Sequence, residues 1–142
     1  MKERRQQIED EGFSAVNKTE VLLALERAAT RNQSLSVTVE DFEPTADIHA
    51  IVRREGRLRN AAVHPTLNGL LEKEIPLENV DEIICWDFGD PAALNEFERH
   101  GYFGGEIAFD LESNGLEYQN HDRNYVELIE VKSLLEAKAP IQ

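Results

Sequence analysis

The sequence has few of the residues that cross-link a chain or anchor it in a membrane. It contains one cysteine among 142 residues, which cannot form an internal disulfide, so an oxidising compartment is not indicated. The four histidines are dispersed, and none has the short spacing of a metal-ligand pair. No uncharged apolar run approaches the roughly 18 residues that span a bilayer, and the charged first residues lack the apolar segment of a secretory signal. We therefore expect a cytoplasmic protein.

Positive charge is scarce as well. The chain has 15 basic and 28 acidic side chains, which gives a formal net charge of −13. Such a surface is not attracted as a whole to nucleic-acid phosphates or to anionic lipids. The acidity is regional, because the stretch from Glu72 to Glu98 holds nine carboxylates and one lysine whereas residues 53–59 are locally basic. A local contact with nucleic acid therefore stays open.

The remaining composition is typical of one globular domain. Apolar residues make up 41% of the chain and charged residues 30%, and single domains commonly contain about 100–150 residues. Helical and strand patterns alternate along the sequence. We expect a charged tail or frayed helix at residues 1–12 and one compact α/β or α+β domain at residues 13–142, with about four strands and about four or five helices.

Helix signals recur along the chain. Asn17, followed three residues later by Glu20, resembles a capping box. Asp90 and Pro91 supply a cap and a first-turn proline. Apolar residues at helical spacing follow these starts. The predicted helices run from Asn17 to Asn32, from Thr45 to Gly56, from Thr66 to Glu74, from Asp90 to Gly101, and from Ser133 to a point before Pro140.

The strand signal is strongest at residues 80–88. Ile83 to Trp86 are apolar without interruption, so both faces of this strand should be covered, which predicts a central strand and an inert core thiol at Cys85. The other predicted strands show alternation over residues 35–40 and 106–112, or lie at residues 125–132. Residues 113–115 are predicted to form a turn and residues 119–124 a polar loop.

One stretch carries a catalytic pattern. Glu130 and Lys132 are two residues apart on a predicted strand, so they would point to one face. With Asp110 on another predicted strand, they suggest metal-assisted phosphodiester hydrolysis, in which Asp110 and Glu130 hold Mg²⁺ and Lys132 assists the attacking water. This arrangement resembles the PD-(D/E)xK nuclease pattern. The alternative is an exposed strand face that carries an ion pair, and the ten residues after Lys132 leave no room for the rest of a standard nuclease core.

A second resemblance covers more of the chain. Residues 80–87 and 126–135, with residues 70–74 before them, are similar to C-terminal accessory domains of prokaryotic ATPases of the gyrase and histidine-kinase type. They also resemble the ends of restriction-endonuclease-like proteins. The resemblance implies an appended interaction domain, because the chain lacks a glycine-rich phosphate loop for an ATPase motor.

The basic cluster is the remaining candidate for binding. Arg53, Arg54, Arg57 and Arg59 suit a phosphate or the carboxylates of a partner. Alternatively, they complement the dipole at a helix end or pair with carboxylates of the same chain. We expect a non-catalytic accessory domain without a cofactor, which binds a partner protein such as an ATPase or a nucleic-acid-processing complex. A Mg²⁺-dependent nuclease and a homodimerising structural protein are the alternatives.

Overall fold

The computed structural model describes residues 15–31, 37–43, 45–46 and 48–136, so the tail predicted at residues 1–12 lies outside the described residues. These residues form one α/β domain with a seven-stranded sheet. The strands are β1 (Val37–Phe42), β2 (Ala50–Arg54), β3 (Arg57–Thr66), β4 (Glu82–Asp87), β5 (Glu106–Asp110), β6 (Gly115–Asn120) and β7 (Asp122–Glu130). The described helices are α2 (Lys18–Arg31), α3 (Leu67–Glu72), α4 (Pro91–His100) and α5 (Val131–Glu136).

The sheet is mixed, with the order β1-β2-β3-β4-β7-β6-β5. The three strands β3, β4 and β7 run parallel in its centre, and an antiparallel pair flanks them on each side. Strand β4 occupies the middle position, and its residues from Glu82 to Trp86 are buried. The prediction of a central strand at residues 80–88 is therefore confirmed, as is the burial of Cys85.

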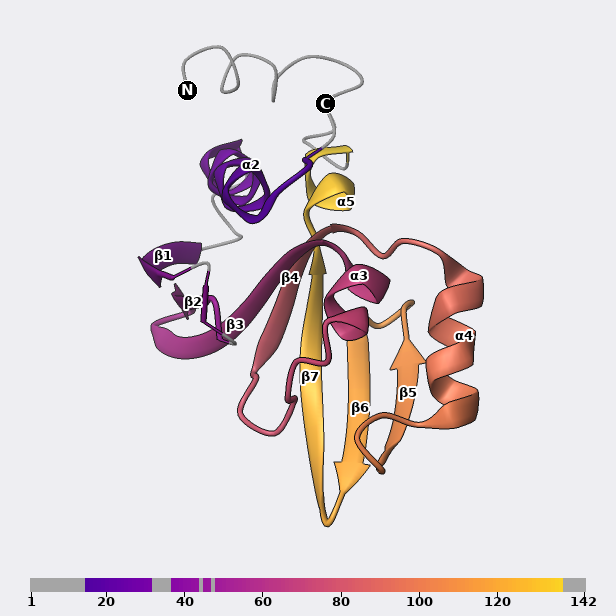
Figure 1. Ribbon diagram of the computed structural model, residues 1–142. Helices are drawn as coiled ribbons and strands as arrows, with labels where there is room; N and C mark the ends of the chain where they lie inside the picture. Colours follow the sequence, from indigo (N-terminus) through magenta and orange to yellow (C-terminus); the bar gives the residue numbers. More distant parts are fainter. Residues whose placement is uncertain (1–14, 32–36, 44, 47, 137–142) are drawn as a thin grey trace.

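Helices cover both faces of the sheet (Figure 1). Helices α2 and α5 pack on one face, which we call the α2 face, through a core that includes Leu25, Val63 and Trp86. Helices α3 and α4 pack on the other face, through a core that includes Leu70 and Tyr118. No helix in the described part of the chain is long and apolar enough to cross a membrane.

The predicted helix starts are confirmed for three helices. Glu20 N–H donates to Asn17 Oδ1 at 2.9 Å, and Glu20 Oε1 accepts from Val16 N–H, so a carboxylate and an amide satisfy free donors at the start of α2. Thr66 caps α3 through Gly69 N–H at 3.1 Å, and Asp90 caps α4 through Ala92 N–H at 3.0 Å.

The helix predicted from Thr45 to Gly56 is wrong. Residues Ala50–Arg54 form β2, which pairs with β3 across a two-residue turn. Both turn residues, Glu55 and Gly56, have positive φ (53° and 79°), as a type I′ hairpin turn requires. Gly56 therefore reverses the chain between strands and does not end a helix, and the apolar stripe at Ile51 and Val52 splits between the two sides of the sheet.

The C-terminal third also differs from the prediction. Residues 115–120 form β6, and a tight turn at His121 joins it to β7, where a polar loop was predicted. Strand β7 ends at Glu130 instead of Lys132, because helix α5 begins at Val131. With β2, β3 and β6 added, the sheet has seven strands instead of about four.

Candidate functional site

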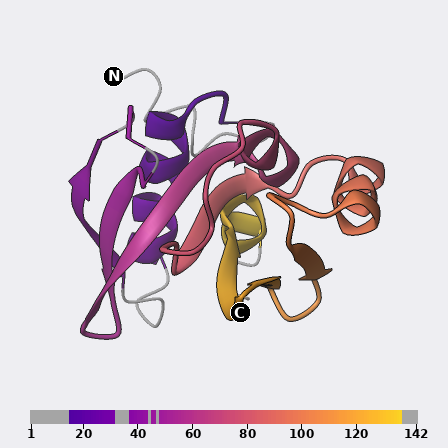
Figure 2. The same cartoon turned by 60° about the horizontal axis from the view of Figure 1, so that its bottom comes forward.

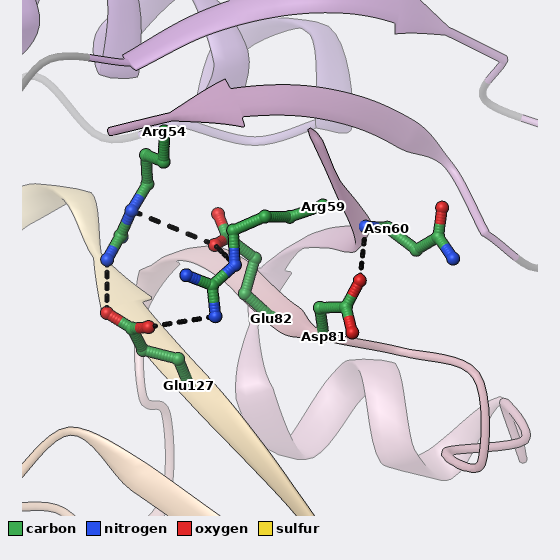
Figure 3. A network of polar contacts seen from close by, with 6 residues as sticks. All are labelled: Arg54, Arg59, Asn60, Asp81, Glu82 and Glu127. Atoms are coloured by element: carbon green, nitrogen blue, oxygen red, sulfur yellow. Dashed lines mark hydrogen bonds and ion pairs between the residues drawn. The ribbon is translucent and has the colours of Figure 1, made fainter. Parts of the chain in front are cut away.

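A half-buried network of two arginines and two glutamates joins the β2–β3 hairpin to the parallel strands (Figure 3). Glu82 on β4 lies beside Glu127 on β7 in the parallel register. Arg59 Nη2 lies 3.2 Å from Glu127 Oε1, and Arg54 Nη2 donates to Glu127 Oε2. Arg59 Nε lies 3.2 Å from Glu82 Oε1, and Arg54 Nε lies 3.9 Å from the same oxygen. Two positive and two negative charges thus balance within the network.

Glu82 is the electrostatically unusual member of the network. Its side chain is 0% exposed, and neither carboxylate oxygen has a hydrogen-bond partner among the described residues. The two guanidinium groups approach Oε1 at ion-pair distance without the geometry of a hydrogen bond. Burial raises the pKa of Glu82 from 4.5 to about 7, although Arg54 and Arg59 act to lower it. The ionised form is therefore costly at this position.

Backbone hydrogen bonds hold the same end of the sheet together. Asn60 N–H donates to Asp81 Oδ2 at 2.8 Å, and Asp81 N–H donates back to Asn60 O at 2.9 Å. Glu127 N–H donates to Asp81 O at 3.1 Å. Asp81 therefore connects β3, β4 and β7 directly beside the charged network (Figure 3). Hydrogen bonds and ion pairs together hold the base of the hairpin in place.

A groove of about 450 Å³ opens next to this network. Its lining includes Arg54 and Glu127 of the network, and Glu130 and Leu134 at the end of β7 and in α5. The turn between β5 and β6 also lines the groove. The groove combines charged groups with apolar side chains, which is suited to holding a side chain of a partner and offers no cluster of metal ligands among the described residues.

The four arginines of the basic cluster do not form one patch. Arg54 and Arg59 form ion pairs with Glu82 and Glu127. Arg53 points to the opposite face of the sheet, where Glu40 Oε2 lies 3.5 Å from its Nε. Arg57 is exposed and makes no ion pair with a described residue. Pairing within the chain therefore accounts for three of the four arginines, and Arg53 and Arg57 are the two that are exposed.

The structure does not bring the three residues of the nuclease hypothesis into one arrangement. Asp110 ends the edge strand β5 and aligns through β6 with Glu127, on the α2 face. Glu130 lies three residues beyond Glu127 on β7 and so points to the opposite face. It accepts hydrogen bonds from Phe88 N–H at 3.0 Å and from the Ser133 hydroxyl. Lys132 is an exposed residue of α5, so it does not share a strand face with Glu130.

The carboxylates that pair with Arg54 and Arg59 were not predicted from the sequence. Glu82 lies inside the strand that was predicted to be covered on both faces, and a charge at such a position needs a partner. Residues 53–59 carry a local surplus of cations, with four arginines against one glutamate. These two observations together could have suggested a contact between Glu82 and the cluster, whereas Glu127 gives no comparable signal.

No family model, no curated protein and no solved structure matches the chain.

The raised pKa of Glu82 predicts how stability depends on pH. The folded protein binds a proton more tightly than the unfolded chain, so the free energy of unfolding should fall as pH rises from about 4.5 to about 7. Glu82→Gln should remove this fall, which corresponds to on the order of 3 kcal/mol between these pKa values. Urea unfolding at pH 5 and pH 8 measures the effect. Glu117→Gln is the control, and equal pH dependence in wild type and Glu82→Gln would contradict the assignment.

The placement of Lys132 in a helix predicts no metal-dependent cleavage that depends on this residue. We expect the wild type and Lys132→Ala to show the same activity, at background level, on fluorescent single-stranded and double-stranded DNA with Mg²⁺. Cleavage by the wild type that is lost in both Lys132→Ala and Glu130→Gln would instead establish the nuclease hypothesis.

Proposed function

We propose that the chain is a non-catalytic interaction domain that binds a partner protein through the β2–β3 hairpin. The observation that carries this proposal is the exposure of Leu58, whose side chain is 58% exposed. Arg53 is its direct cross-strand neighbour on β2, and Arg57 precedes it in the chain. We call Arg53, Arg57 and Leu58 the hairpin contact. The register places Arg57 opposite Arg54, on the α2 side, so Arg53 alone shares the side of Leu58. An apolar side chain beside one guanidinium group, with a second at the end of the hairpin, is suited to a partner surface that offers carboxylates around an apolar pocket.

The position of the hairpin supports this role. Its turn lies at the margin of the domain, on the side away from α4 (Figure 2). Arg54 and Arg59 fix the hairpin from the α2 face, whereas Arg53 and Leu58 lie on the other side of the same two strands. Because the ion network restrains the hairpin before binding, the partner does not have to supply the ordering entropy of these strands.

The identity of the partner follows only from the sequence resemblance. An accessory domain of an ATPase of the gyrase and histidine-kinase type, or of a restriction-endonuclease-like protein, would contact the other parts of such a complex. The acidic surface of the chain disfavours nucleic acid as the direct ligand. A protein partner with a locally acidic surface agrees better with the charges of Arg53 and Arg57.

Quantitative affinity purification from the native host tests the proposal. The tagged wild type and the variant Arg57→Glu/Leu58→Ser should be compared in cells that express each at the same level. We expect one set of proteins to be recovered with the wild type and to fall at least about tenfold with the variant, because central apolar and arginine contacts contribute most of the binding energy of an interface.

The matched control is Arg123→Glu/Tyr125→Ser on β7. This variant also removes one exposed arginine and one exposed apolar side chain, since Tyr125 is 56% exposed. It should recover the same proteins as the wild type. Equal losses in both variants, or no loss in the hairpin variant while both proteins stay folded, would refute the assignment to the hairpin contact.

A further inference from the structure

Strand β5 forms one edge of the sheet, at the end opposite to β1. Strand β5 pairs only with β6 and lies beside α4 (Figure 1). The outward backbone groups of an edge strand are a template for another strand. Phe109 N–H donates to Glu98 Oε2 at 2.8 Å, which shows that the N–H groups of Phe109 and Ile107 point away from β6.

At Ile107 only the backbone can take part in such pairing, because its side chain is buried in the core. Gly105 N–H, on one side of Ile107, donates to Tyr102 O at 2.9 Å, and Phe109 N–H on the other side is taken by Glu98. No described residue accepts the outward N–H of Ile107. One residue of an added strand can exchange two hydrogen bonds with Ile107, because opposed residues in an antiparallel pair share both their N–H and C=O groups.

A groove of about 430 Å³ lies along the same edge. It is lined by the end of α4 at Glu98 and His100, by Ile107 itself, and by the turn at Gly104 and Gly105. That turn displays Phe103, which is 50% exposed. Phe103 has a φ of 50° within this turn, a conformation that is unfavourable for a bulky residue. Its ring contacts Tyr102 edge-on, with 4.8 Å between the ring centroids, and its free face is available to an apolar side chain of a ligand.

The groove is acidic. Its lining holds the carboxylates of Glu98, Glu106 and Glu117 against Arg99 and His100, and Glu117 is paired with Arg123 at 3.0 Å. Arg99 and His100 both contact Glu96, at 2.9 and 3.0 Å, so the positive groups near the groove are already paired. Glu106, on the strand itself, is exposed and forms no ion pair with a described residue. A ligand that complements the charge of this groove carries positive charge.

From these observations we propose that the β5 edge binds an extended, basic segment of a partner protein, which adds a strand at Ile107 and packs an apolar side chain against Phe103. This site is separate from the hairpin contact and does not depend on it. A second copy of the chain is a poorer occupant, because it would place the same acidic margin against itself, and like charges that face each other across strands are destabilising.

Titration with synthetic peptides tests this inference. The probes are a nine-residue peptide of alternating lysine and valine, the same peptide with glutamate in place of lysine, and a fully N-methylated form of the first. We expect the lysine peptide alone to bind and to shift the backbone amide signals of Gly105, Ile107 and Phe109 in nuclear magnetic resonance spectra. Fluorescence anisotropy at constant salt gives the affinities.

Matched variants identify the site. Glu106→Lys should weaken binding of the lysine peptide about fivefold, since reversing an exposed charge changes about two weak ion-pair energies. Glu55→Lys carries the same change of net charge on the distant hairpin turn and should bind as the wild type does. Phe103→Asn should weaken binding without lowering the melting temperature, because asparagine tolerates the positive φ.

Several results would overturn the inference. These are no binding of the lysine peptide, equal binding of the N-methylated peptide, or equal effects of Glu106→Lys and Glu55→Lys, which would indicate diffuse attraction to an acidic surface. Sedimentation of the free chain as a dimer with the Ile107 amide protected from exchange would show that a second copy occupies the edge. The hairpin variant Arg57→Glu/Leu58→Ser should leave peptide binding intact, so this inference and the proposed function can fail separately.

Discussion

The buried carboxylate of Glu82, on the central strand, fixes where the β2–β3 hairpin lies, because the arginines of the hairpin must approach it. A carboxylate that is fully buried at the start of the central strand is unfavourable unless cations approach it. Arg54 and Arg59 reach it from two strands, and both also pair with Glu127. The network therefore ties the antiparallel hairpin to the parallel strands. Because Glu82 lacks hydrogen bonds from described residues, the network contributes more to fixing this position than to total stability.

The pleat of β2 and β3 places the arginines that stabilise the hairpin on one side of these strands, and Arg53 and Leu58 of the proposed contact on the other. Side chains alternate between the two sides of a strand, so neighbouring arginines of one basic cluster serve different purposes. Arg54 and Arg59 hold the hairpin, whereas Arg53 and Leu58 remain on the opposite side. The two proposed contact surfaces differ in charge. The hairpin contact is basic and apolar, and the margin of β5 is acidic. The two proposed contacts therefore call for partner segments of opposite charge.

The sequence predicted the elements whose signals are local. The capping residues Asn17 and Asp90 marked the starts of α2 and α4, and the uninterrupted apolar run from Ile83 marked the central strand. The helix predicted over β2 failed because its short apolar stripe fits either periodicity, and only the pairing with β3 decides between them. The pairing of Glu82 and Glu127 with the arginines depends on the register of distant strands, which local patterns do not contain.

A double-mutant cycle between Arg54 and Glu127 tests the central claim most directly. The free energy of unfolding would be measured in urea at pH 7.5 for the wild type, Arg54→Met, Glu127→Gln and the double variant. If the network fixes the hairpin, the two substitutions should be coupled by about 1 kcal/mol or more, as is typical of contacting residues in one ion network. Effects that add to within about 0.3 kcal/mol would show that the contact carries no such energy, and would contradict the account.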